Sequence, residues 1–126
     1  RGLTTYRQTQ VQSRTPLELV TMLNDGVIRF LGNARDAVVR RDIAARRDAL
    51  NRALAIISEL QSTLNIEKGG AVAAELDRLY EYSTLRLLDA AMRNEVEPID
   101  EVLRIFGILR DGWSTIARPQ GQEPPR

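Results

Sequence analysis

The sequence contains no cysteine and no histidine among its 126 residues. The first absence excludes disulfide bonds, thiolate nucleophiles and cysteine metal sites. The second removes the commonest general base and the usual zinc ligand. No apolar run approaches the roughly 18 residues that indicate a transmembrane helix, and no signal peptide is visible. The chain begins with Arg1 and not with Met, so we expect native residues to precede it. Because the sequence has no cysteine and no visible export signal, we expect a cytoplasmic protein.

The charged residues nearly cancel, because 18 basic and 17 acidic residues leave a net charge of +1. A dedicated nucleic-acid-binding protein usually carries a clear basic excess. Residues 29–52 nevertheless hold seven arginines against three aspartates, whereas residues 53–111 hold six basic and eleven acidic residues. We interpret these segments as two oppositely charged, solvated faces that pack side by side.

Apolar residues recur at helical spacing from residue 15 to residue 117. Thr15 suits a helix N-cap, Pro16 suits the first helical position, and Glu18 can complete a capping box. Asp42 is a second N-cap candidate, and Gly69-Gly70 permits the backbone geometry of a helix exit. The pattern predicts four helices, over about residues 16–39, 42–64, 71–93 and 98–117.

Each predicted helix carries one apolar stripe that faces the core. The stripes run from Val20 to Val38, from Ile43 to Leu64, from Val72 to Ala90 and from Ile99 to Ile116. Short breaks force each helix to reverse against its predecessor. The prediction is an all-α protein, an antiparallel up-down-up-down four-helix bundle over residues 15–117. Residues 1–14 form a polar N-terminal segment, and residues 118–126 have the composition of a disordered tail.

No residue pattern predicts catalysis. A di-metal site in a helical bundle uses Glu-x-x-His motifs, and the chain has no histidine. The acidic residues around the start of the fourth helix, such as Glu97 and Asp100, complement the helix dipole. Gly69-Gly70 lacks the preceding strand and the spacing of a phosphate-binding loop. We therefore predict that the protein is not an enzyme, and we expect no cofactor and no metal site.

The third and fourth helices carry more apolar residues than one core-facing stripe requires. This surplus comprises Tyr82, Leu85, Leu88, Met92, Ile105 and Ile108, together with Ile66 in the preceding loop. Single exposed apolar residues are ordinary, and bundle helices often bury a broad stripe. As a set, however, these residues favour a groove that receives an amphipathic helix from a partner.

Asn24 and three glycines interrupt the helical pattern. Asn24 falls on the core-facing stripe of the first helix, where a buried amide needs hydrogen-bond partners or lines a site that a partner covers. Gly26, Gly107 and Gly112 each cost about 1 kcal/mol against Ala within a helix. Close approach of another backbone would explain that cost, and so would simple tolerance of it.

Several ordered segments carry a resemblance to a known family. They are Tyr6-Arg7, Thr15 to Val20, Leu23 to Leu31, Ile56 to Asn65, Glu67 to Gly70, Leu76 to Tyr82 and Leu109 to Trp113. Together they resemble the FliS family of flagellin-specific export chaperones, over about residues 4–117. The chain departs from that family at Asn24, where Tyr is usual, and at Pro98, where a helix former such as Ala is expected.

The resemblance implies a cytoplasmic bundle that binds the C-terminal disordered segment of flagellin and prevents its premature polymerisation. It also implies delivery to the export gate of the flagellar type III secretion apparatus. In the family, the N-terminal segment packs on the bundle and can vacate part of the flagellin site. Position by position, the resemblance adds Tyr6, Asn24, Asp25 and Gly26. The expected flagellin-binding residues are then Tyr6, Asn24, Asp25, Gly26, Ile66, Tyr82, Leu85, Leu88, Met92, Ile105 and Ile108.

Two alternative functions remain open at this point. One is a basic face that holds nucleic acid, made by Arg40, Arg41, Arg46, Arg47 and Arg52. The other is a purely structural bundle that associates with itself. If the protein is instead a flagellin chaperone, as the resemblance implies, we expect no nucleic-acid partner and no stable membrane insertion.

Overall fold

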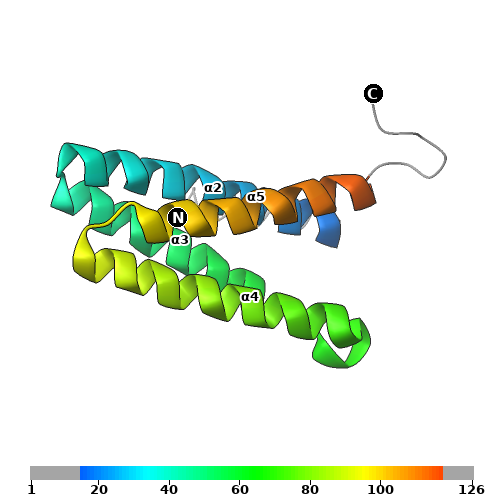
Figure 1. Ribbon diagram of the computed structural model, residues 1–126. Helices are drawn as coiled ribbons and strands as arrows, with labels where there is room; N and C mark the ends of the chain where they lie inside the picture. The colour runs from blue at the N-terminus through cyan, green and yellow to red at the C-terminus, as the bar shows by residue number, and fades with distance from the viewer. Residues whose placement is uncertain (1–14, 118–126) are drawn as a thin grey trace, which may run out of the picture.

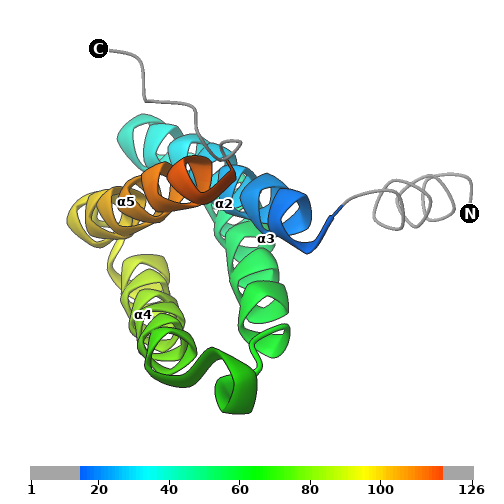
Figure 2. The same cartoon turned by 90° about the vertical axis from the view of Figure 1, so that its right-hand side faces the viewer.

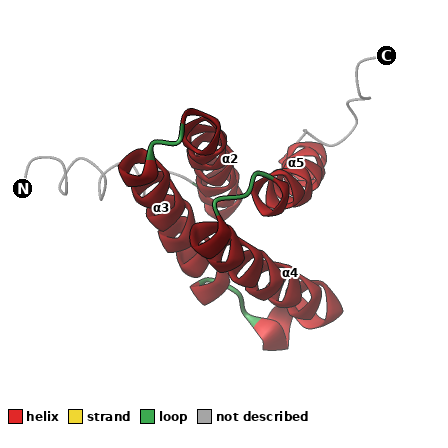
Figure 3. Cartoon of the chain, turned by 60° about the vertical axis from the view of Figure 1, so that its left-hand side comes forward, coloured by secondary structure: helices red, strands yellow, loops and turns green. Residues whose placement is uncertain are grey.

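The computed structural model describes residues 15–117, and within this range the chain forms four helices and no strand. The helices are α2 (Pro16–Arg40), α3 (Ile43–Ser62), α4 (Ile66–Arg93) and α5 (Glu97–Ala117), joined by short loops (Figures 1 and 3). The prediction of an all-α four-helix bundle is therefore confirmed. The expectations for Tyr6, for the N-terminal segment 1–14 and for the tail 118–126 lie outside the described residues.

Polar side chains start three of the helices. Thr15 Oγ1 accepts a hydrogen bond from the Glu18 backbone N–H at 3.1 Å. Asp42 Oδ1 accepts from Ala45 N–H at 3.0 Å, and Asn65 Oδ1 accepts from Lys68 N–H at 3.1 Å. Each side chain satisfies a backbone donor that has no partner within its own helix. The predicted caps at Thr15 and Asp42 are thus confirmed, whereas the cap at Asn65 was not predicted.

That additional cap moves the start of α4. We predicted a loop from residue 65 to residue 70, but the chain is already helical from Ile66. Gly70 interrupts the helix with φ 56° and ψ −132°, a conformation that side chains with a Cβ rarely adopt, and the helix then continues to Arg93. Ile66 therefore lies in a helical first turn and not in a loop. The cause is local, because Asn65 caps the turn that precedes the glycine break.

Neighbouring helices run in opposite directions. Between α2 and α5, contacts join Asn24 to Phe106, Asp25 to Arg110 and Arg35 to Asp100, so one residue number rises as the other falls. The colour gradient in Figure 1 shows the same alternation for all four helices. Each helix packs against two others, α2 against α3 and α5, and α4 against α3 and α5. Figure 2 shows this arrangement from another side.

The core lies between the four helices at the middle of their stripes. Its largest fully buried apolar side chains are Tyr80, Phe106, Leu31, Leu50, Ile57, Leu60, Leu87, Ile99, Val27 and Val102. The rings of Tyr80 and Phe106 stack with centroids 6.0 Å apart, and burial raises the pKa of Tyr80 to about 12. The ends of the predicted stripes are wrong as core positions. Ile43, Val72 and Ile116 are exposed, because each lies close to the end of its helix.

Candidate functional site

Three large apolar side chains are exposed on the outer side of α4. Leu85, Leu88 and Met92 are 58%, 47% and 86% exposed. Spacings of three and four residues place them on one side of the helix, while Ser83 and Leu87 are buried in the bundle. We call Leu85, Leu88 and Met92 the α4 face. Large apolar surface of this kind stays in contact with water unless another molecule covers it.

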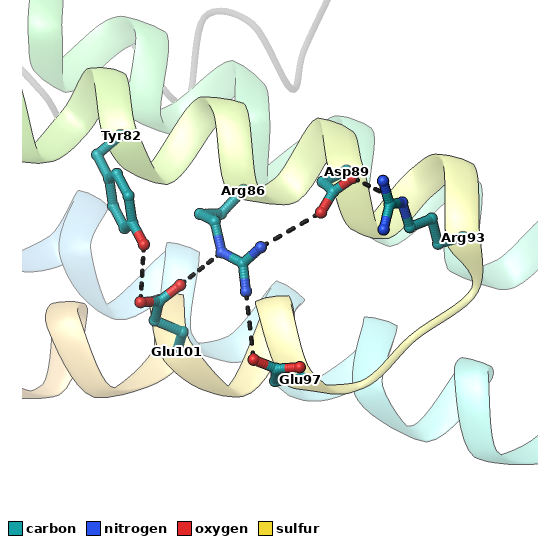
Figure 4. A network of polar contacts seen from close by, with 6 residues as sticks. All are labelled: Tyr82, Arg86, Asp89, Arg93, Glu97 and Glu101. Carbon is teal, nitrogen blue, oxygen red and sulfur yellow. Dashed lines mark hydrogen bonds and ion pairs between the residues drawn. The ribbon is translucent and has the colours of Figure 1, made fainter.

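A polar network borders the α4 face and joins α4 to α5 (Figure 4). The Tyr82 hydroxyl donates to Glu101 at 2.8 Å, and Arg86 Nε donates to the other oxygen of the same carboxylate at 2.5 Å. Arg86 also reaches Asp89 at 3.2 Å and Glu97 at 3.7 Å. Asp89 also forms an ion pair at 3.1 Å with Arg93, which lies four residues further along α4. Tyr82, one of the predicted site residues, is therefore oriented toward α5.

The network shifts the ionisation of its members. The hydrogen bond from Tyr82, followed by that from Arg86, lowers the pKa of Glu101, because both stabilise the carboxylate. The same bond to Glu101 raises the pKa of Tyr82, and the bond to Glu101 likewise raises the pKa of Arg86. Arg86, Asp89 and Glu101 are half-buried, and through them the network ties α5 to α4.

A second surface lies between α2 and α5. It is a groove of about 730 Å³, which we call the α2/α5 groove. Its lining comprises Asp25, Ile28 and Arg29 from α2 and Arg104, Gly107, Ile108, Arg110 and Asp111 from α5. Arg110 Nε donates to Asp25 Oδ1 at 2.6 Å across the groove, and Ile108 is 71% exposed. The groove thus brings together two predicted site residues, Asp25 and Ile108.

Asn24 and Gly26 hold the helices together beside this groove. Asn24 is fully buried, and its Nδ2 donates to the Phe106 carbonyl at 3.0 Å, while its Oδ1 has no hydrogen-bond partner. A Cβ built at Gly26 would lie 3.1 Å from Ile56 Cδ1, so this glycine allows α2 to approach α3 closely. Both residues position α2, and the side chain of Asn24 offers no exposed atom to a partner.

The other predicted residues are dispersed. Ile66 is exposed in the first turn of α4, and Ile105 is half-buried against the core. The structure also shows lining residues that the sequence did not single out for binding, namely Arg29 and Arg104. The helical glycine Gly107 was noticed, but only the pairing of α2 with α5 shows that it lines a groove.

The five arginines considered for nucleic-acid binding do not form one exposed face. Arg46 is only 9% exposed, and it donates from Nη2 to the Ala91 carbonyl at 3.2 Å and from Nη1 to Asn94 Oδ1. It thereby joins α3 to the end of α4. Arg52 forms an ion pair with Asp48 at 3.0 Å. A phosphate backbone would therefore meet fewer free guanidinium groups than the sequence suggested.

Two kinds of site are not found within residues 15–117. No group of three or more acidic side chains is arranged to hold a metal ion there. None of the four helices is long and apolar enough to cross a membrane.

Comparison with known proteins gives consistent matches over almost the whole chain. The family model described as flagellar protein FliS matches residues 1–120. The flagellar secretion chaperone FliS of Salmonella typhimurium is 36% identical over 121 residues, which cover 92% of this chain and 90% of the relative. FliSB of Pseudomonas aeruginosa is 34% identical over 110 residues, covering 87% of each chain. FliS of Campylobacter jejuni is 35% identical over 111 residues, covering 88% of this chain and 87% of the relative. All three names describe secretion chaperones and none describes an enzyme, in agreement with the prediction from the sequence.

Proposed function

The chain belongs to the FliS family of flagellar proteins, which gives it the role of an export chaperone, and we propose that its cargo is the disordered C-terminal segment of flagellin. The segment docks on the α4 face in a one-to-one complex. The observation that carries this proposal is the exposure of Leu85, Leu88 and Met92 at helical spacing. A segment that becomes an amphipathic helix can cover such a stripe along its length.

Holding the segment requires no chemistry. The apolar side of the flagellin segment would otherwise pair with other flagellin molecules, and burial on the chaperone prevents that premature assembly. Ordering a disordered segment costs conformational entropy, so a long contact is needed for tight binding. We place the complex in the cytoplasm, from which the chaperone delivers flagellin to the flagellar type III export apparatus.

The test is a titration of a flagellin C-terminal peptide into the full chain, followed by calorimetry and circular dichroism. Leu85→Glu combined with Leu88→Glu should weaken binding at least about tenfold, which is about 1.4 kcal/mol. Ile43→Glu is the matched control, because Ile43 is also exposed but lies on α3. Ile105 is unsuitable for a charge substitution, since it is half-buried against the core.

Two results would contradict the proposal. One is an unchanged affinity of the folded double variant for the flagellin peptide. The other is a circular dichroism spectrum of the mixture that equals the sum of its parts, since a segment that folds on binding must gain helical signal.

A further inference from the structure

Met92 is the most exposed of the large apolar side chains in residues 15–117, with 86% of its surface open to solvent. The 126 residues contain no cysteine and only one other methionine, Met22, which is half-buried in α2. In a chain without thiols, the thioether of methionine is the group that a peroxide oxidises most readily. The sulfur of Met92 is therefore the site at which an oxidant dissolved in water should react first.

Met92 also occupies a position where a change of polarity has a consequence. It is the last member of the α4 face, one residue before Arg93, at which α4 ends, and Leu88 lies one helical turn before it. A thioether suits an apolar contact because its sulfur is polarisable and its side chain is flexible. The side chains of Leu85 and Leu88 are saturated hydrocarbons and do not react with peroxide. Met92 is thus the one member of the face whose polarity can change without a change of sequence.

We propose that Met92 is a reversible oxidation site that controls how apolar the α4 face is. A hydroperoxide transfers one oxygen atom to the thioether: a lone pair of the sulfur attacks the peroxide oxygen, the S–O bond forms and the O–O bond breaks. With hydrogen peroxide the leaving group departs as water, so the sulfur loses two electrons and the peroxide gains them. A sulfoxide reductase that uses a dithiol reverses the step, releasing the oxygen as water and leaving a disulfide on the reductant.

The sulfoxide should weaken flagellin docking, and this consequence rests on the proposed function. The new S–O group is polar and would be buried against the apolar side of the bound segment, where hydrocarbon side chains offer no hydrogen-bond donor. Oxidation should not harm the fold, because Met92 lies outside the core that the four helices enclose. Loss of binding without loss of stability is the signature that separates a switch from oxidative damage.

The first experiment measures the oxidation itself. The full chain is exposed to hydrogen peroxide, and the fraction of sulfoxide at each methionine is followed by mass spectrometry of its proteolytic peptides. Met92 should oxidise at least about tenfold faster than Met22, because burial restricts the access of peroxide to the sulfur. Urea midpoints of the reduced and the oxidised chain should agree. Equal oxidation rates, or a large drop in the midpoint once Met92 alone is oxidised, would overturn the proposal.

The second experiment is a calorimetric titration of the flagellin C-terminal peptide into the full chain after the peroxide has been removed. The oxidised chain should bind at least about fivefold more weakly than the reduced chain, and a methionine sulfoxide reductase with dithiothreitol should restore the affinity. Met92→Leu is the matched variant, because it keeps an apolar side chain without sulfur, and its affinity should be the same before and after peroxide treatment. The proposal is wrong if oxidation leaves the affinity of the parent unchanged, or if it weakens Met92→Leu to the same extent.

A third measurement distinguishes failure of this inference from failure of the proposed function. Retention of the full chain on a hydrophobic-interaction column reports its exposed apolar surface without any flagellin. The oxidised parent should elute earlier than the reduced parent, and peroxide should not shift Met92→Leu. If the parent shows this shift but the reduced chain does not bind the flagellin peptide, the proposed function fails and the oxidation site stands. Unchanged retention contradicts the oxidation site even if the reduced chain binds flagellin.

Discussion

Replacing Arg46 by Met should destabilise the bundle by about 2 kcal/mol, because it removes the polar link between α3 and the end of α4. Arg46 donates to the Ala91 carbonyl and to the Asn94 side chain, and Asn94 is the left-handed residue that ends α4. The guanidinium also places a positive charge at a helix C-terminus, where the helix dipole favours it. Met retains an unbranched apolar side chain, so the change isolates the polar head.

The magnitude follows from opposing terms. Two hydrogen bonds from a charged donor contribute about 3 to 6 kcal/mol in total. Burying the guanidinium costs desolvation free energy, and this cost is large here because Arg46 Nε has no hydrogen-bond partner. Its removal in the Met variant therefore offsets several kcal/mol of the destabilisation. Ala91 and Asn94 are exposed residues, so water can satisfy part of what the guanidinium leaves. The remainder of about 2 kcal/mol corresponds to a decrease in Tm of roughly 10 °C for a domain of this size.

The assay is urea unfolding followed by far-UV circular dichroism, with the unfolding slope m compared between variants. Arg47→Met is the matched control, because Arg47 is the exposed neighbour on α3 and loses the same charge. We expect the control to lie within about 0.5 kcal/mol of the parent. Equal urea midpoints for the two Met variants would refute the reasoning, since they would show that the buried contacts of Arg46 add nothing.

Glu101→Gln should lower stability at pH 6, and the difference from the parent should disappear in acid. The lowered pKa of Glu101 means that its contribution is present above the ordinary pKa of about 4.5 and is lost as the pH falls through the folded value. Urea midpoints of the variant and the parent at neutral and acidic pH measure this difference in stability. A difference that does not change with pH would contradict the prediction. Gly70→Ala should destabilise the fold by about 1 to 3 kcal/mol, because its φ of 56° with ψ −132° strains any residue with a Cβ. Gly32→Ala, in α2 with open space, should instead stabilise it by about 0.5 to 1 kcal/mol, and equal effects on the thermal midpoint would argue against backbone strain at Gly70.

Local signals along the chain predicted the helices well. Thr15 and Asp42 act as caps because a cap depends only on residues within one turn. The same locality explains the error at α4, where Gly69-Gly70 indicated a helix boundary although Asn65 already caps a preceding turn. Periodicity also assigned Val72 to the core, because it records which side of a helix a residue occupies and not how far the neighbouring helix extends.

The candidate site was predicted only in part. Leu85, Leu88 and Met92 were found as a surplus stripe, and the structure leaves them exposed. Ile105 belonged to the same set, yet it packs against the core. It lies one helical turn after Glu101, whose carboxylate contacts α4, so both residues are on the side of α5 that faces α4. The α2/α5 groove could not be predicted, since its lining residues are about eighty positions apart and meet only through the register of α2 with α5.

The sequence by itself determined the helical class, the number of helices and the exclusion of thiol and imidazole chemistry, because these depend on composition and on patterns within a few turns. Tertiary structure decided which apolar residues remain exposed and which polar side chains are buried. Asn24 and Arg46 show the reason. Both side chains are buried, and their hydrogen-bond partners, the Phe106 carbonyl and the end of α4, lie far away in the chain. Only the packing of whole helices brings such groups within hydrogen-bond distance.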